Sequence, residues 1–285
     1  MNTNKTTEKF VCIRVHSWPK TVFALLALPL WGQDPASIVR RSVQRDASNF
    51  ERIQNYTFVE RNEEREFGRD GKLKSTDIET YEILILGGRP YGRLIERKDQ
   101  PLSLKDQRKE QEKLDKEAAK RQSESAADKA REEKKRLEQR KFMRELPDAF
   151  NFTLAGVEQV SGLPAWVIEA QPKPGYRAVE SRAKLFAKVR GKIWIDQTDY
   201  QWVKAEAEII STLSFGLGLL RIAPGGRLAF EQVRVNDEVW LPLRIAARGE
   251  ARLGYVKKLR ADLDVTYKDY KKFQSDSRIV EVTEK

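Results

Sequence analysis

The chain has 285 residues, of which 34% are charged and 40% hydrophobic, and its formal net charge is +11. This length suits one large domain or two small ones, and the composition indicates a soluble fold that carries a very polar segment. The charge favours an acidic partner, for which nucleic acid, anionic lipid and acidic polysaccharide all qualify, and a single cysteine excludes an internal disulfide.

The first 33 residues are typical of a secretory signal peptide. Four basic residues precede the apolar run TVFALLALPLW at 21–31, and Gly32 and Gln33 follow it. The run is too short to span a bilayer, which needs about 20 apolar residues. We therefore expect a signal peptide over 1–33 that is cleaved near Gly32 or Gln33, a single domain over 34–280, and a protein that is periplasmic or secreted.

The leader also contains Cys12 and His16, the only cysteine and the only histidine of the chain. The mature protein would therefore have no thiol nucleophile, no imidazole base and no ordinary zinc site, so we expect no metal and no cofactor. Cys12 precedes the apolar run, so it is in the wrong place for a lipid-modified cysteine. Outside the cytoplasm nucleic acid is not the usual polyanion, and we expect no nucleic-acid partner.

Helical and strand patterns follow in turn. Over 35–55 the apolar residues Ile38, Val39, Val43, Ala47 and Phe50 recur at spacings of three and four, which predicts an amphipathic helix. A strand is expected next, and then a hairpin whose turn contains two adjacent glycines.

Residues 103–146 differ from the rest of the chain. They are rich in strong helix formers and in charges of both signs, with many Glu-to-Lys or Glu-to-Arg pairs four residues apart. No sustained apolar stripe supports a coiled coil. We expect a charged helical insertion that is mainly solvated, and the alternative is an arm that touches an acidic partner or a membrane surface. On the first interpretation, replacing Lys105–Arg144 with a short Gly/Ser linker should leave the melting transition nearly unchanged.

After Pro147 the pattern predicts strands that alternate between apolar and charged residues. In one of them Leu263 and Val265 point one way, and Asp262 and Asp264 point the other. This alternation is typical of an antiparallel sheet with one face in water. Together with the helices it predicts an α+β fold.

Several strands place small residues in the middle of the apolar face. Ala205 and Ala207 share a face with Val203 and Ile209, and Ala247 follows Ile245 on another strand. Dense cores prefer larger β-branched or aromatic residues on such a face. Either a helix packs closely there, or the space forms a cavity for an apolar ligand. The apolar stretch 210–226 is expected to be a buried strand that leads into a glycine turn, with a mobile lip of that cavity as the alternative.

The order of elements, and above all the segments GKIWIDQTDYQWVKAEAEI and VNDEVWLPLRI, resembles the LolA/LolB-like group of bacterial envelope proteins. These are structural markers and not catalytic motifs. The resemblance implies a curved antiparallel half-barrel wrapped around helices, with an apolar cavity for acyl chains. The 103–146 insertion and the strongly basic charge depart from the pattern.

The function expected on these grounds is binding of lipid, or of the acyl chains of a lipidated protein, in the cell envelope, and the alternative is a sensor or protein-interaction module of the same fold. An enzyme is not expected. The pair Asp196 and Asp199 is better explained by turn chemistry, and the pair Asp262 and Asp264 by solvation on a strand. The residues expected to line the ligand cavity are Trp166, Ile168, Ala205, Ala207, Phe215, Ile245, Ala247 and Leu263.

Overall fold

The structure is a computed structural model that describes residues 34–273, apart from 217–218 and 254–256. The expected signal peptide over 1–33, and the last residues of the expected domain, lie outside the described residues.

The first described helix, α1 (Pro35–Ile53), begins where the sequence pattern predicts. The carboxylate of Asp34 accepts hydrogen bonds from the backbone amides of Ala36 and Ser37, at 3.2 and 3.1 Å, and Pro35 occupies the first turn. Ile38, Val39 and Val43 are buried, as expected, but Ala47 is exposed. The buried stripe continues instead through Ser42 and Asn49, because Asn49 serves as a polar contact to the sheet.

Most of the remaining chain forms strands. The strands are β1 (Tyr56–Phe67), β2 (Leu73–Leu86), β3 (Arg89–Arg97), β4 (Gln100–Pro101), β5 (Phe150–Val160), β6 (Leu163–Pro172), β7 (Val189–Asp196), β8 (Trp202–Ile209), β9 (Leu213–Phe215), β10 (Leu220–Ile222), β11 (Arg227–Val235), β12 (Val239–Leu253) and β13 (Lys257–Lys272). The further helical elements are α2 (Leu104–Gln122), α3 (Ala126–Glu138), α4 (Leu146–Ala149) and two 3₁₀ segments, η1 (Lys141–Glu145) and η2 (Ser181–Lys188).

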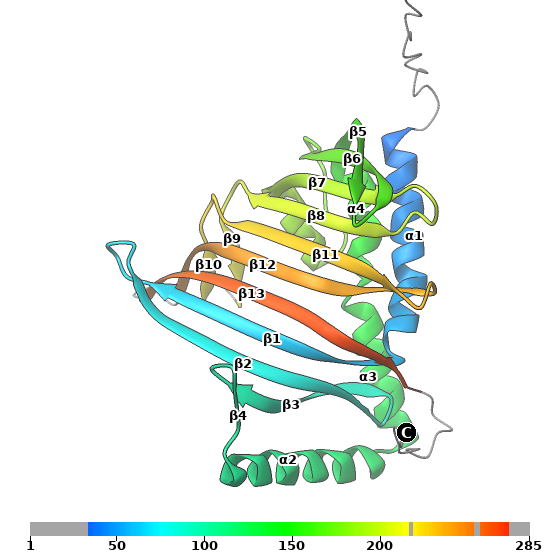
Figure 1. Cartoon of the computed structure of the whole chain (residues 1–285). Helices are drawn as coiled ribbons and strands as arrows, with labels where there is room; N and C mark the ends of the chain where they lie inside the picture. Colours follow the sequence, from blue (N-terminus) through cyan, green and yellow to red (C-terminus); the bar gives the residue numbers. More distant parts are fainter. Residues whose placement is uncertain (1–33, 217–218, 254–256, 274–285) are drawn as a thin grey trace, which may run out of the picture. The chain divides into compact units, whose positions relative to one another are not determined.

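All these strands join one antiparallel sheet in the order β4-β3-β2-β1-β13-β12-β11-β8-β7-β6-β5, and the short hairpin β9–β10 attaches to β12 (Figure 1). The last strand, β13, pairs with the first, β1, so the two ends of the fold meet inside the sheet. Register shifts interrupt several pairings, including β1 with β2 and β11 with β12. Such bulges increase twist and bend a sheet. The α+β class and the curved, unclosed antiparallel sheet are therefore confirmed.

The charged helices form a connection between the two edges of the sheet. β4 ends at one edge and β5 begins at the other, and α2, α3, η1 and α4 lie between them in the chain (Figure 1). α2 and α3 have no buried residues. The expected insertion 103–146 does not end in solvent, however, because Phe142, Met143 and Leu146 pack in the main core.

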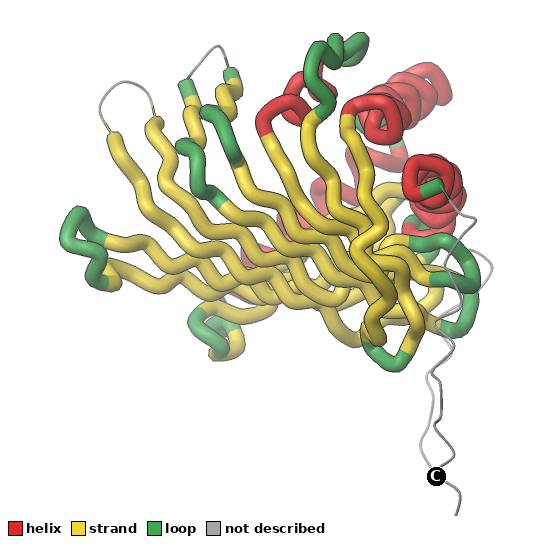
Figure 2. The backbone as a smooth tube through the Cα atoms, turned by 90° about the horizontal axis from the view of Figure 1, so that it is seen from above, coloured by secondary structure: helices red, strands yellow, loops and turns green. Residues whose placement is uncertain are grey.

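Helices lie to one side of the strands (Figure 2). The main core forms where α1, α4 and η2 meet β5, β6 and β7, and it includes Ile38, Val39, Phe150, Ile168 and Ile193. Asn49 fixes α1 to β12 with two buried hydrogen bonds, from its amide to the Trp240 carbonyl at 2.7 Å and from the Trp240 amide to its carbonyl at 2.8 Å. The helical packing is therefore concentrated over one part of the sheet.

Candidate functional site

The strand registers sort the side chains of the sheet into an apolar face and a charged face. On the apolar face one row across neighbouring strands consists of Ile193, Ala205, Phe230, Ile245 and Val265. The next row on that face consists of Gly191, Ala207, Leu228, Ala247 and Leu263. Ile168 of the main core pairs with Ile193, so the apolar face continues outward from the core.

Two of the expected cavity residues are part of the packed core. Trp166 is 7% exposed and Ile168 is fully buried, and both belong to the cluster that packs around α1. The ring of Trp166 lies 5.0 Å from that of Tyr200, centroid to centroid. These two side chains therefore anchor the sheet to α1 and leave little room for a ligand at their own positions.

The other six expected residues lie farther out on the same face. Ala205, Ala207, Ile245 and Ala247 are half-buried, Leu263 is 37% exposed and Phe215 is 46% exposed. Phe215 joins this face through the hairpin β9–β10, where Leu213 pairs with Ile222 and Ile222 with Ala251. The apolar face is thus continuous from the core to the hairpin, and its outer part is open.

The sequence reasoning missed Leu228 and Phe230, which lie between the expected alanines. Leu228 is 47% exposed and pairs with both Ala207 and Ala247, and Phe230 pairs with Ala205 and Ile245. The signal was present in RLAFEQVRV at 227–235, where leucine and phenylalanine stand two residues apart as on one face of a strand. The stretch 210–226 is not a buried strand, because Ile210, Phe215 and Leu219 are exposed, although the glycine turn that follows it is present.

Two glycines next to these alanines lie where neighbouring strands approach closely. A Cβ atom on Gly191 would lie 2.1 Å from the carbonyl oxygen of Glu206, and one on Gly226 would lie 2.9 Å from Cδ1 of Ile209. Atoms of neighbouring strands therefore fill the space at these two positions. Neither of the two expected explanations, a closely packed helix or a ligand cavity, accounts for these glycines. At Ala205, Ala207 and Ala247 the side chains remain half-buried.

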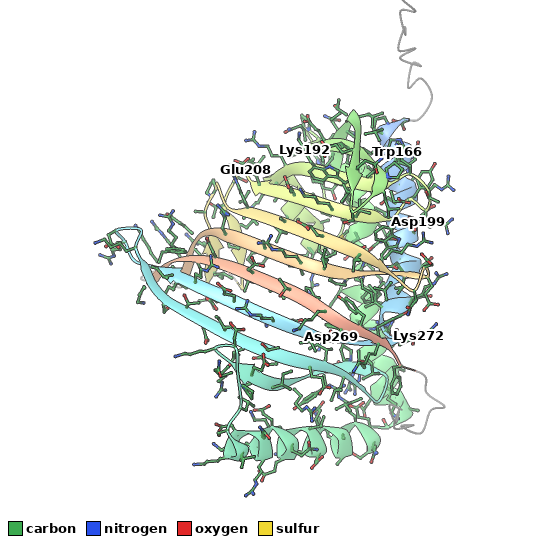
Figure 3. The ribbon with its side chains drawn as sticks, viewed as in Figure 1. Trp166, Lys192, Asp199, Glu208, Asp269 and Lys272 are labelled. Atoms are coloured by element: carbon green, nitrogen blue, oxygen red, sulfur yellow. The ribbon has the colours of Figure 1, made fainter. Side chains whose placement is uncertain are left out.

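The opposite face carries a charged trough of ≈ 600 Å³ that crosses the strands from β6 to β1. Ala229 and Ala246 lie in its middle, and charged side chains surround them. The lining also includes Gly191, Ala207, Leu228, Ala247 and Leu263, because these residues of the apolar face alternate with the charged ones along the same strands. Many of the charged side chains are paired. Nζ of Lys192 lies 3.0 Å from Glu169, and Nη2 of Arg190 lies 3.0 Å from Glu208. Figure 3 labels Lys192 and Glu208, which belong to this face.

Ion pairing also keeps the acidic groups of the trough charged. Arg244 donates a hydrogen bond from Nε to Asp264 at 2.9 Å, and this bond holds the pKa of Asp264 below its ordinary value although burial opposes it. Hydrogen bonds from Arg61 and Arg65 lower the pKa of Glu63 in the same way. Arg227 and Arg248, which face each other across β11 and β12, make no ion pair with the described residues.

Three of the four aspartates in the pairs Asp196/Asp199 and Asp262/Asp264, which could in principle act on glycosides, have structural partners. Oδ1 of Asp196 accepts the backbone amides of Thr198 and Asp199, both at 2.9 Å, which is the expected turn. Oδ2 of Asp199 accepts the indole N–H of Trp240 at 2.7 Å. Asp264 is the ion-pair partner of Arg244.

Two general features concern the described part of the chain. Among the described residues, no group of three or more His, Cys, Asp or Glu side chains is placed so that it could hold a metal ion. None of the helices described here is both long and apolar enough to cross a membrane.

A scan against protein-family models finds no match, and neither does a search of curated proteins. Among solved structures, the chain is similar to a Vibrio parahaemolyticus domain described as an outer-membrane lipoprotein-sorting protein, with 12% identity, 85% of this chain and 95% of that one covered, and a TM-score of 0.36. A LolA superfamily protein from Nitrosomonas europaea is 12% identical, with 86% of this chain and 95% of that one covered, and the TM-score is 0.34. MucB, solved in complex with MucA, is 9% identical, with 85% of this chain and 100% of that one covered, and the TM-score is 0.24.

Proposed function

We propose that this chain is a non-enzymatic binding protein of the bacterial cell envelope that holds an acyl chain, from a lipid or a lipidated protein, against the open part of its apolar face. The observation that carries the proposal is the combination of half-buried small residues with partly exposed large ones on a single face. Ala207 and Ala247 flank Leu228, and Leu263 continues the row. The sequence resemblance to the LolA/LolB group points to the same class of ligand.

The energetics suit an acyl chain. Burial of an acyl chain contributes about 0.8 kcal/mol per CH₂ group, so micromolar binding, about 8 kcal/mol, corresponds to about ten methylenes removed from water along this face. Water contacts the exposed parts of Leu228 and Leu263 in the free protein, and a ligand laid along the row would remove that apolar surface from water.

The test uses two neighbouring alanines of β12 that point to opposite faces. In Ala247→Trp the indole would occupy the proposed ligand row, and in the matched control Ala246→Trp it would occupy the charged trough. We expect binding of a fluorescent fatty acid to fall by roughly 15- to 60-fold in Ala247→Trp, which corresponds to two or three displaced methylenes, and to stay unchanged in Ala246→Trp.

The stability of the two variants separates a ligand row from a packed one. Ala247 is half-buried, so the larger side chain should leave the melting temperature within a few degrees of the parent, whereas overpacking of a closed core costs about 1–3 kcal/mol. Equal fatty-acid binding by both variants and the parent would remove the basis of the proposal. Mass spectrometry of organic extracts from natively purified protein then distinguishes an acyl ligand from the alternative, a lipid-free protein-interaction module.

A further inference from the structure

A second hollow, of ≈ 680 Å³, lies where β1 ends and β13 begins, beside β10 and the last part of β12. We call this region the hairpin end of the sheet, because the β1–β2 turn and the short strands β9 and β10 lie there, at the opposite ends of the strands from α1 (Figure 1). Five of the residues that line the hollow are basic, namely Arg69, Arg221, Arg252, Lys258 and Arg260. Its lining contains one acidic residue, Glu250.

Three of these cations stand in one row across three strands. Arg221 of β10 pairs in register with Arg252 of β12, and Arg252 pairs with Lys258 of β13. Neighbouring strands are about 4.8 Å apart, so the three Cα positions fall within about 10 Å. Like charges directly opposite each other on adjacent strands destabilise a sheet. The free protein therefore bears an electrostatic cost at this row.

The charges at the hairpin end are not neutralised within the described residues. Arg69, Arg221, Arg252 and Lys258 form no ion pair there, and Arg260 lies 5.9 Å from the ring of Phe67. In the charged trough of the same sheet most basic side chains have a carboxylate partner, among them Arg190, Lys192 and Arg244, and only Arg227 and Arg248 of its lining form no ion pair with the described residues. An anionic partner at the hairpin end would explain why the basic side chains there lack carboxylate partners.

Exposed apolar side chains at the same end indicate which kind of anionic partner binds there. Phe215 is 46% exposed and Leu219 is 63% exposed, and Leu219 precedes Arg221 by two residues. A soluble polyanion would satisfy the cations but would leave these apolar side chains in water. A membrane surface accepts both, because apolar side chains enter the boundary between headgroups and acyl chains while basic residues are attracted to anionic headgroups.

We propose that the hairpin end docks the protein on an anionic membrane surface, with Phe215 and Leu219 at the headgroup boundary and the row Arg221, Arg252 and Lys258 facing the anionic headgroups. The basic row of this docking site is separate from the ligand row of the proposed function, whereas Phe215 lies at the outer end of the apolar face that contains the ligand row. Vesicle binding tests the docking site and fatty-acid binding tests the ligand row, so one can fail while the other holds.

The experiment measures co-sedimentation of the full chain with phosphatidylcholine vesicles that contain or lack phosphatidylglycerol. Each basic residue near an anionic surface contributes about fivefold to binding, so Arg221→Gln with Arg252→Gln should weaken binding to the anionic vesicles roughly 30-fold. The matched control is Lys116→Gln with Lys129→Gln, which removes the same charge from exposed positions of α2 and α3 and should leave binding within about twofold. Phe215→Ser with Leu219→Ser should weaken binding roughly tenfold.

The melting temperature and the binding of soluble anions are measured as controls. Removing like charges from the row should hold or raise the melting temperature of Arg221→Gln with Arg252→Gln, so a loss of binding cannot be ascribed to unfolding. Polyglutamate and inorganic phosphate serve as soluble anions. Equal loss in the control pair, equal binding to vesicles without phosphatidylglycerol, or binding to polyglutamate with no binding to vesicles would each overturn the proposal.

Discussion

The length of the connection between the two edges of the sheet should decide whether the fold survives replacement of the charged helices. We consider variants in which residues 104–138 are replaced by Gly/Ser segments of different length. Phe142 and Met143 are kept, because both pack in the main core. For this reason the replaced range is shorter than the expected Lys105–Arg144, and a short linker is no longer expected to be harmless.

The required reach follows from the strand registers. Pro101 of β4 pairs with Glu96, and the same row continues through Thr80, Arg61 and Thr266 to Arg244 of β12. Five strand spacings of about 4.8 Å give about 24 Å, and the four residues from Arg244 back to Trp240 add about 13 Å at right angles.

The end point of the connection lies near Trp240. The guanidinium of Arg140, just after α3, is 4.1 Å from the ring of Phe50, and α1 is bound to Trp240 through Asn49. The linker must therefore span about 27 Å. A fully extended chain covers this distance with about 8 residues, and a flexible Gly/Ser chain has this root-mean-square length at about 24 residues.

A segment of about 24 residues should lower the melting temperature by less than about 8 °C, because α2 and α3 bury no residues and the replacement removes only a few polar contacts with the rest of the fold. Chief among these are the hydrogen bonds from Nη1 of Arg121 to the carbonyl oxygens of Leu86 and Arg89, at 3.0 and 2.9 Å. A segment of about four residues cannot reach and should pull Phe142 and Leu146 out of the core, with a larger loss or no cooperative transition. Thermal unfolding followed by circular dichroism measures both. Similar melting temperatures for the two lengths would refute the edge-to-edge connection.

Three other predictions concern stability and processing. Asn49→Leu should lower the free energy of unfolding by about 2–4 kcal/mol in urea titrations, because it leaves the buried amide and carbonyl of Trp240 without partners, and a change below about 0.5 kcal/mol would contradict this. Burial opposes ionisation of Glu145, but hydrogen bonds from Tyr176 and from the amides of Val179 and Glu180 lower its pKa, so its stabilising effect is present at neutral pH and is lost as the pH falls through that lowered pKa. Glu145→Gln should therefore be less stable than the parent at pH 7 and should approach it in acid, and parallel stability-pH curves would argue against this role. N-terminal sequencing of protein from the envelope fraction should begin close to Gln33–Ala36, and an intact Met1 form in the cytoplasm would contradict the predicted secretion.

Local patterns in the sequence predicted much of the fold because they depend on neighbouring residues. The apolar spacing of Ile38, Val39 and Val43 predicted α1, and the alternation around Leu263 and Val265 predicted a strand with one apolar face. The turn formed by Asp196 and Asp199 was also predictable, since a carboxylate that accepts amides two and three residues later is a local arrangement. For the site, alternation placed Ala205, Ala207, Ile245 and Ala247 on one face.

Long-range pairing decided the rest. No local pattern indicates that β13 pairs with β1, and this pairing puts β4 and β5 at opposite edges, which turns the charged insertion into a connection that must span the sheet. Tertiary packing alone placed Trp166 and Ile168 under α1 and left Leu263 and Phe215 partly open, because alternation specifies the face of a side chain and not what covers it. The row of Arg221, Arg252 and Lys258 likewise appears only when three strands are set in register, since charges far apart in the sequence become neighbours through backbone hydrogen bonds.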